Sequence, residues 1–145
     1  MRILGLDLGE KRVGVSISDE IGFSAQPLST IHVNEQEAFF TQIKELVDDY
    51  GVVKIVVGLP LNMDGTLGTQ GRQVMKIVKN LKNKVNIPIR TWDERLSTVA
   101  VTKNLIGANV SRKKRKKIVD KLSAVFILQG YLDYLSHRKK KNGNF

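Results

Sequence analysis

The sequence contains no cysteine, and this absence excludes several kinds of chemistry together. Without thiols the chain cannot form a disulfide scaffold, a thiolate zinc site or a cysteine nucleophile. The two histidines, His32 and His137, are too few and too scattered for a histidine-based zinc site. The lack of cysteine is compatible with a cytoplasmic location, which we expect.

Long apolar runs are also missing. No stretch approaches the roughly 20 residues that a membrane-spanning helix needs, so we expect no membrane partner. Asp7 and Glu10 interrupt the apolar residues after Arg2 before the hydrophobic region of a signal peptide could form. Neither a G-x-S-x-G elbow nor a Walker phosphate loop is present. The composition therefore leaves carboxylate–metal chemistry open as a hydrolytic route.

Positive charge is concentrated at one end of the chain. Residues 1–111 hold 13 Lys/Arg and 12 Asp/Glu, a balance of +1, whereas residues 112–145 hold 11 Lys/Arg and 2 Asp, a balance of +9. A nearly neutral body with one strongly basic end favours a polyanionic partner such as nucleic acid. A basic end that only improves solubility is the alternative.

The hydrophobic pattern predicts one α/β domain. At 145 residues the chain is too short for two ordinary domains. We expect residues 1–138 to form this domain and residues 139–145 a basic, disordered tail. Strands are predicted at residues 3–8, 13–17, 26–33, 54–57 and 87–92, and helices at 35–50, 74–85, from Ser97 or Thr98 to Leu105, and 111–135. This order predicts a mixed central sheet of about five strands, an antiparallel three-strand meander followed by βαβ units, with helices on both faces.

Three carboxylates are candidates for the chemistry. Asp7 lies inside an apolar strand, where an unpaired charge would be costly. Asp93 and Glu94 end the last strand, and because side chains alternate, only one of them can face Asp7. Asp120 lies in the last helix, before the small residues Ser123 and Ala124, which would let that helix approach the sheet.

Each carboxylate also has an ordinary explanation. Asp7 could accept hydrogen bonds from the following turn, Arg95 could pair with the acidic strand end, and Asp120 could offset nearby lysines. If the carboxylates converge, they could hold Mg²⁺ or Mn²⁺, because these cations prefer oxygen ligands. Such a centre could cleave a phosphodiester bond by a two-metal mechanism.

A run of six cations precedes Asp120 in the last predicted helix. Positive charges in the first turns oppose the helix dipole and repel one another, which bound phosphates would compensate. A frayed, solvated helix start is the alternative. The loop at residues 58–71 could also meet sugar or phosphate, or could be an ordinary connection. The candidate nucleic-acid-binding residues are Lys11, Arg12, Asn62, Arg72, Arg95, Arg112, Lys113, Lys114, Arg115, Lys116 and Lys117.

Four blocks, in order along nearly the whole chain, carry a family resemblance: ILGLDLG at 3–9 with KRVGVSISD at 11–19, GLPLNMDG at 58–65, DERLST at 93–98, and DKLSA at 120–124 with ILQGYL at 127–132. Together they resemble the YqgF (RuvX) family. The resemblance implies a ribonuclease-H-like fold and a nuclease site at Asp7, Glu94 and Asp120. It also implies processing of the 5′ end of pre-16S ribosomal RNA or, alternatively, resolution of Holliday junctions.

Some questions stay open at this stage. Ser123 stands where the family more often has Ala, and a fourth carboxylate, Asp93 or Asp19, could take part. The first block also resembles the phosphate-binding hairpin of actin-like ATPases and sugar kinases, which need a second domain. A non-catalytic RNA-binding assembly factor is a further alternative. Structured RNA is favoured over branched DNA by the resemblance alone, and the chain could be a monomer or a homodimer.

Overall fold

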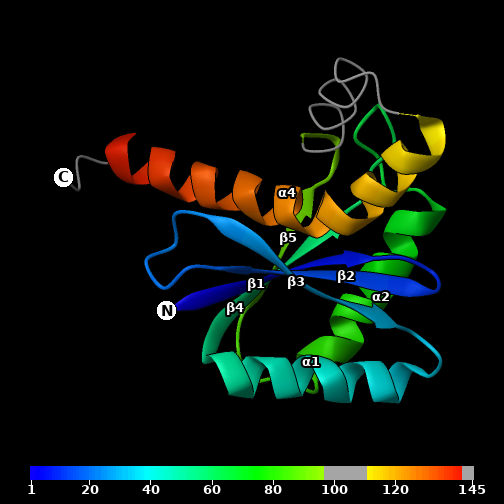
Figure 1. Ribbon diagram of the computed structural model, residues 1–145, viewed down its shortest axis with the longest axis horizontal. Helices are drawn as coiled ribbons and strands as arrows, with labels where there is room; N and C mark the ends of the chain where they lie inside the picture. The colour runs from blue at the N-terminus through cyan, green and yellow to red at the C-terminus, as the bar shows by residue number, and fades with distance from the viewer. Residues whose placement is uncertain (97–110, 142–145) are drawn as a thin grey trace.

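A computed structural model describes residues 1–96 and 111–141, without the side chains of residues 112, 113, 115–121 and 141 (Figure 1). In chain order its elements are β1 (Arg2–Leu8), β2 (Arg12–Ser18), β3 (Ala25–His32), α1 (Gln36–Tyr50), β4 (Val52–Leu59), α2 (Thr69–Lys82), β5 (Ile89–Asp93) and α4 (Arg112–Lys141). All five predicted strands and three of the predicted helices are present. The short helix predicted after Ser97 lies outside the described residues.

The five strands form one sheet in the order β3-β2-β1-β4-β5. The β1–β2 and β2–β3 pairs are antiparallel, whereas β1–β4 and β4–β5 are parallel. This is the predicted meander followed by βαβ units. Because β1, β4 and β5 are parallel, their carboxyl ends lie at one edge of the sheet, where side chains from all three can meet.

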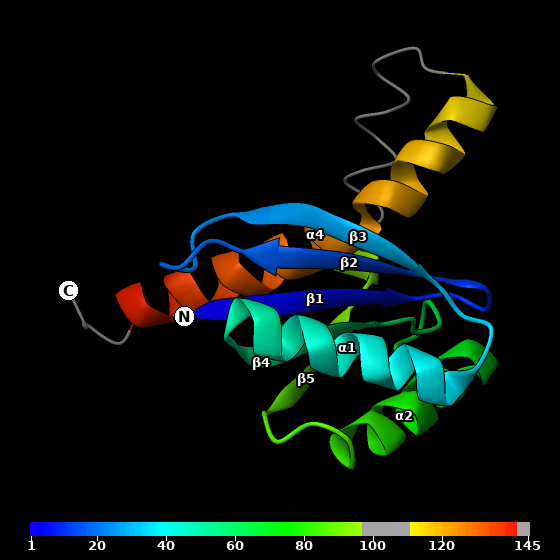
Figure 2. The ribbon, with the colours of Figure 1, turned by 60° about the horizontal axis from the view of Figure 1, so that its bottom comes forward.

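Helices cover both faces of the sheet, as predicted (Figures 1 and 2). Alternate side chains of β1, including Leu4 and Leu6, are fully buried in a core with α1 and α2. The opposite face packs against α4 through a second core that includes Ile3 and Leu128. Among the described helices, none combines the length and apolar character that crossing a membrane requires.

The last helix lies very close to the sheet. The buried Ser16 hydroxyl donates a hydrogen bond of 2.6 Å to the Ala124 carbonyl, across 108 residues of sequence. A Cβ atom at Gly5 would lie 2.8 Å from Leu128 Cβ, so glycine permits this approach. The small residues before and at Ala124 therefore have the predicted effect.

Contacts along α4 give its direction. Ile127 and Leu128 pack near the middle of the sheet, whereas the Tyr131 hydroxyl accepts a hydrogen bond of 3.0 Å from Lys54, near the start of β4. Later residues of α4 therefore lie toward the start of β1, and the helix begins at the edge where β1 ends. The helix continues to Lys141, beyond its predicted end at Leu135, so residues 139–141 are helical. The division into a domain at 1–138 and a tail stays a prediction.

Candidate active site

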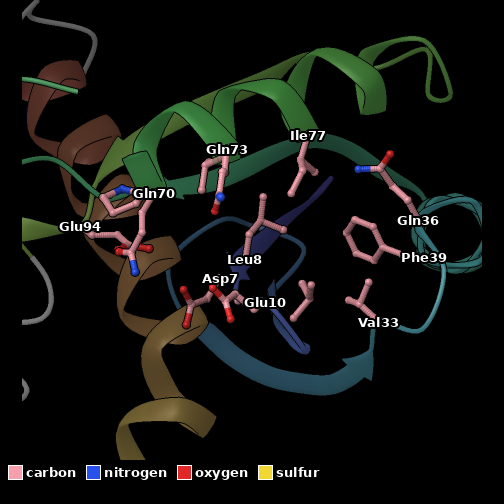
Figure 3. Close-up of a pocket in the computed structure, with 14 residues that line it drawn as sticks. Asp7, Leu8, Glu10, Val33, Gln36, Phe39, Gln70, Gln73, Ile77 and Glu94 are labelled. Carbon is pink, nitrogen blue, oxygen red and sulfur yellow. The ribbon is translucent and has the colours of Figure 1, made fainter. Parts of the chain in front are cut away.

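Asp7 and Glu94 meet at the carboxyl ends of β1 and β5. Asp7 is the penultimate residue of β1, and Glu94 directly follows β5, where its backbone N–H donates a 3.2 Å hydrogen bond to the Leu59 carbonyl. Their side chains form a hydrogen bond with each other. Two strands far apart in sequence thus bring together two of the three predicted carboxylates (Figure 3).

The strand pattern explains why Glu94, and not Asp93, faces Asp7. Gly58 lies on β4 between them, and a Cβ atom at this position would lie 2.7 Å from Glu94 Oε1. The Glu94 side chain therefore extends across β4 directly over Gly58. A glycine here leaves the space that the carboxylate pair occupies, which the sequence pattern alone did not reveal.

The environment of the pair favours protonation of Glu94. Burial, the negative charge of Asp7, the hydrogen bond with Asp7 and the charge of Asp93 raise the pKa of Glu94 from 4.5 to about 7. Two carboxylates that are hydrogen-bonded to each other cannot both ionise freely, because their negative charges repel. Near neutral pH the pair therefore tends to hold a proton or, equally, to favour a bound cation in its place.

Asp93 has a different partner. Arg95 Nη2 donates a 2.7 Å hydrogen bond to Asp93 Oδ2, and Arg95 Nη1 donates to the backbone carbonyls of Asn62 and Met63 at 3.3 and 3.1 Å. The Arg95 guanidinium holds the pKa of the Asp93 carboxyl below its usual value. The pairing that the sequence offered as an alternative is therefore present for Asp93, and it ties the end of β5 to the loop after β4.

Asp19, the other possible fourth carboxylate, lies elsewhere. It follows β2, which is antiparallel to β1 with Ile17 beside Leu4, so it lies at the edge of the sheet opposite Asp7. Its carboxylate accepts a 2.8 Å hydrogen bond from the Phe23 backbone and closes the β2–β3 turn. This position separates Asp19 from the Asp7–Glu94 pair.

Asp120 belongs to α4, one helical turn before Ala124. The direction of α4 places residues before Ala124 toward the edge where β1 ends. The Asp120 side chain is not among the described ones, so its convergence with Asp7 and Glu94 stays a prediction. Among the described side chains, no group of three or more His, Asp and Glu forms a metal-ligating cluster.

The basic run occupies the first turns of α4, which begins at Arg112. The Ser111 hydroxyl accepts a 3.4 Å hydrogen bond from the Lys114 backbone N–H, and the Lys114 side chain is exposed. In Figure 2 these turns project beyond the sheet. Lys11 in the β1–β2 turn and Arg12 at the start of β2 are exposed, at the same edge as Asp7. Cations from two separate segments thus lie toward the carboxylate end of the sheet.

The other predicted nucleic-acid contacts organise the loop between β4 and α2. The Asn62 side-chain amide donates a 3.0 Å hydrogen bond to the Thr66 hydroxyl, and Arg72 Nη1 donates one of 3.0 Å to the Leu67 carbonyl. Together with Arg95 these bonds fix the loop beside the carboxylate pair. Nucleic-acid binding by Asn62, Arg72 and Arg95 stays a prediction.

A pocket of about 420 Å³ opens beside the pair. It is lined by Asp7, Leu8, Gly9, Glu10, Val13, Val33, Gln36, Phe39, Pro60, Gln70, Gln73, Val74, Ile77 and Glu94 (Figure 3). Sequence reasoning missed its glutamines and apolar wall. The i, i+3 spacing of Gln70 and Gln73 places them on one helix face, but only the topology brings α1 and α2 to the same edge.

Comparisons with known proteins agree with this arrangement. The model of the RuvX family, described as Holliday junction resolvase, matches residues 1–134. A Bacillus mycoides protein is 55% identical over 135 residues, covering 92% of this chain and 98% of the relative. A Bacillus subtilis protein is 52% identical over 138 residues, covering 94% and 100%. Both are named "Putative pre-16S rRNA nuclease".

A solved structure shares the fold at low sequence identity. T. thermophilus RuvC, solved in complex with a Holliday junction substrate, superposes with a TM-score of 0.65 at 12% identity, covering 94% of this chain and 96% of RuvC. This likeness confirms the ribonuclease-H-like fold. With a family model matched over most of its length and relatives that are more than half identical, the chain belongs to the RuvX family.

Proposed function

We propose that this chain is a cytoplasmic, divalent-metal-dependent nuclease that hydrolyses a phosphodiester bond in structured nucleic acid, with pre-16S ribosomal RNA as its substrate. The observation that carries the proposal is the meeting of Asp7 and Glu94 at the carboxyl ends of two strands, with a raised pKa at Glu94. The names of the curated relatives support the choice of RNA. Asp120 is the proposed third member of the site.

The donor set fits a hard divalent cation. Asp7 and Glu94 offer carboxylate oxygens, which Mg²⁺ and Mn²⁺ prefer, and their mutual repulsion is relieved when a cation lies between them. Asp7, Glu94 and Asp120 would hold the metal. When bound, the metal would lower the pKa of water and stabilise charge on the leaving oxygen.

The chain's other residues would bind and orient the substrate. Lys11 and Arg12 are exposed beside Asp7, and the run at residues 112–117 begins α4 at the same edge. These cations would hold phosphates on either side of the carboxylates, so binding would weaken steeply with salt. The loop fixed by Arg95 would supply a rigid wall next to Glu94.

The test is cleavage of labelled pre-16S RNA precursor in Mg²⁺, in Mn²⁺ and in EDTA, by wild type, by Asp7→Asn and by Asp48→Asn. Asp48 is exposed on α1 and serves as the matched charge control. We expect metal-dependent cutting that Asp7→Asn loses and Asp48→Asn keeps, while all three proteins bind the RNA. Binding with no cutting, and with no difference among the three, would leave a non-catalytic RNA-binding factor.

Branched DNA is a second candidate substrate, because the matching family model is described as Holliday junction resolvase. A resolvase that cuts two strands symmetrically would act as a dimer. A four-way DNA junction run beside the RNA, with the protein's mass measured by light scattering, separates the two. Symmetric cutting by a homodimer would favour the junction, whereas cutting of RNA alone would favour the precursor.

A further inference from the structure

The pocket beside the carboxylate pair has two chemically different ends. Figure 3 shows Asp7, Glu10 and Glu94 toward one end, and Val33 and Phe39 toward the other. Its volume of about 420 Å³ lies within the range of about 300–1,000 Å³ that is typical of small-ligand pockets. A ligand group that enters it would therefore extend directly from the carboxylate pair into an apolar chamber.

The chamber is formed by side chains from four parts of the chain. Leu8 and Val33 come from the end of β1 and the residue after β3, Phe39 from α1, and Val74 and Ile77 from α2. Phe39 and Val74 are buried, and the other three are half-buried. Such a wall favours the faces of a flat, weakly polar group over a hydrated one.

Three amides complete the lining. Gln36, Gln70 and Gln73 are exposed at the pocket, and none of their side-chain amides makes a hydrogen bond within the described part of the chain. Figure 3 shows Gln73 pointing from α2 toward Leu8. Each amide offers both a donor and an acceptor, the combination that a nucleobase edge requires.

The charge of the lining excludes a phosphate from the chamber. Among the described residues that line it there is no Lys or Arg, while Asp7, Glu10 and Glu94 contribute three carboxylates. The exposed cations Lys11 and Arg12 lie outside the lining. A phosphate would therefore stay at the mouth, and only an uncharged part of a nucleotide would enter.

We propose that the pocket receives one unpaired nucleobase from a nucleotide next to the cleaved phosphodiester bond. The inference rests on the proposed nuclease function and deepens it, because it makes the substrate class a structured nucleic acid with an unpaired nucleotide at the cleavage site. A paired base would first have to leave its stack, which costs a few kcal/mol. An already unpaired base avoids this cost, so the pocket selects for bulges, loops and single-stranded junctions.

Binding in EDTA tests the proposal without any cleavage. The probes are two RNA hairpins that carry one bulged nucleotide, either adenosine or an abasic residue, and their affinities are measured by fluorescence anisotropy. We expect wild type to bind the adenosine bulge about tenfold more tightly than the abasic one, the effect of one or two good hydrogen bonds and apolar contacts. Equal affinity for the two hairpins would overturn the proposal.

Variants locate the effect in the pocket. Gln73→Leu removes an amide, and Ile77→Trp fills the apolar chamber; both are expected to reduce the tenfold preference to less than twofold. Gln42→Leu, an exposed position on α1 outside the lining, is the matched control and should keep the preference. Circular dichroism checks that each variant folds. A preference that survives both pocket variants would show that the base binds elsewhere.

A direct observation separates this inference from the nuclease proposal. In the wild-type complex in EDTA, nuclear Overhauser effects are expected between the bulged adenine protons and the methyl groups of Val33 and Ile77. Their presence in a protein that cuts nothing would leave the pocket proposal standing and remove the nuclease one. Cutting with no such nuclear Overhauser effects, and with no preference for the adenosine bulge, would leave the nuclease proposal standing and remove the pocket proposal.

Discussion

The carboxylate pair makes a specific prediction about stability and pH in the absence of metal. The pKa of Glu94 is raised from 4.5 to about 7, first by burial and then by Asp7. The folded protein therefore keeps a proton that the unfolded chain releases above pH 4.5. Because the unfolded state binds fewer protons in this window, the free energy of unfolding falls as pH rises from about 4.5 to about 7.

The size of this effect follows from the same interval. The difference between 4.5 and about 7 corresponds to at most roughly 3 kcal/mol. Because Glu94 is only half-buried, solvent screening reduces this change in the free energy of unfolding to about 1–2 kcal/mol. Glu94→Gln removes the titrating group, so at pH 8 in EDTA the variant is expected to be more stable than wild type by this amount.

Urea unfolding of both proteins between pH 4.5 and 8.5 in EDTA measures the effect as the difference between the two pH profiles. Asp93→Asn is the control for which the opposite change in stability is expected. Arg95 lowers the pKa of Asp93, so the charged carboxylate stabilises the folded state at any pH above the ordinary pKa of aspartate. That variant should be less stable than wild type at pH 8. Parallel profiles for wild type and Glu94→Gln would refute the reasoning.

Three further predictions concern the elements around the pair. Gly58→Ala places a methyl group 2.7 Å from Glu94 Oε1, so we expect at least a tenfold loss of cleavage with a destabilisation of about 1–3 kcal/mol, measured by single-turnover kinetics and thermal unfolding. Ser16→Ala leaves the Ala124 carbonyl without its 2.6 Å hydrogen bond and should cost about 1–3 kcal/mol in urea unfolding; no change would contradict the close packing of α4. Arg95→Ala removes the hydrogen bonds to the Asn62 and Met63 carbonyls, so amide hydrogen exchange in the loop after β4 should accelerate. Unchanged exchange would show that Arg95 does not hold this loop in place.

Much of the architecture is readable from the sequence because its signals are local. Alternating apolar residues and tight turns predict the meander. Helical spacing predicts α1 within one residue, whereas it places the start of α2 at 74 instead of Thr69, because the apolar stripe begins only at Val74. The end of α4 is misplaced because Lys139, Lys140 and Lys141 look like a solvated tail, yet the helix continues through the first two and ends at the third. Charge alone does not distinguish an exposed helix end from a tail.

The site is only partly readable, because its geometry depends on topology. Alternation shows that one of Asp93 and Glu94 faces Asp7, but the choice depends on the pairing of β5 with β4, which places Glu94 over Gly58. Nothing in the sequence separates Asp19 from the other candidate carboxylates, and it lies at the opposite edge only because β2 is antiparallel to β1. The pocket combines α1, α2 and a β-turn, and no local pattern brings these together.

The central claim is that carboxylates from two strands and one helix act as a single catalytic site. Single-turnover cleavage of the pre-16S RNA precursor, the proposed substrate, by Asp120→Asn and by Asp133→Asn tests it most directly. Asp133 is an exposed acid on the same helix, hydrogen-bonded to Gln129 at 2.9 Å. The account predicts that Asp120→Asn loses at least about 100-fold in rate, as a metal ligand would, while Asp133→Asn stays within about twofold of wild type. Cleavage by Asp120→Asn at the wild-type rate would contradict the claim.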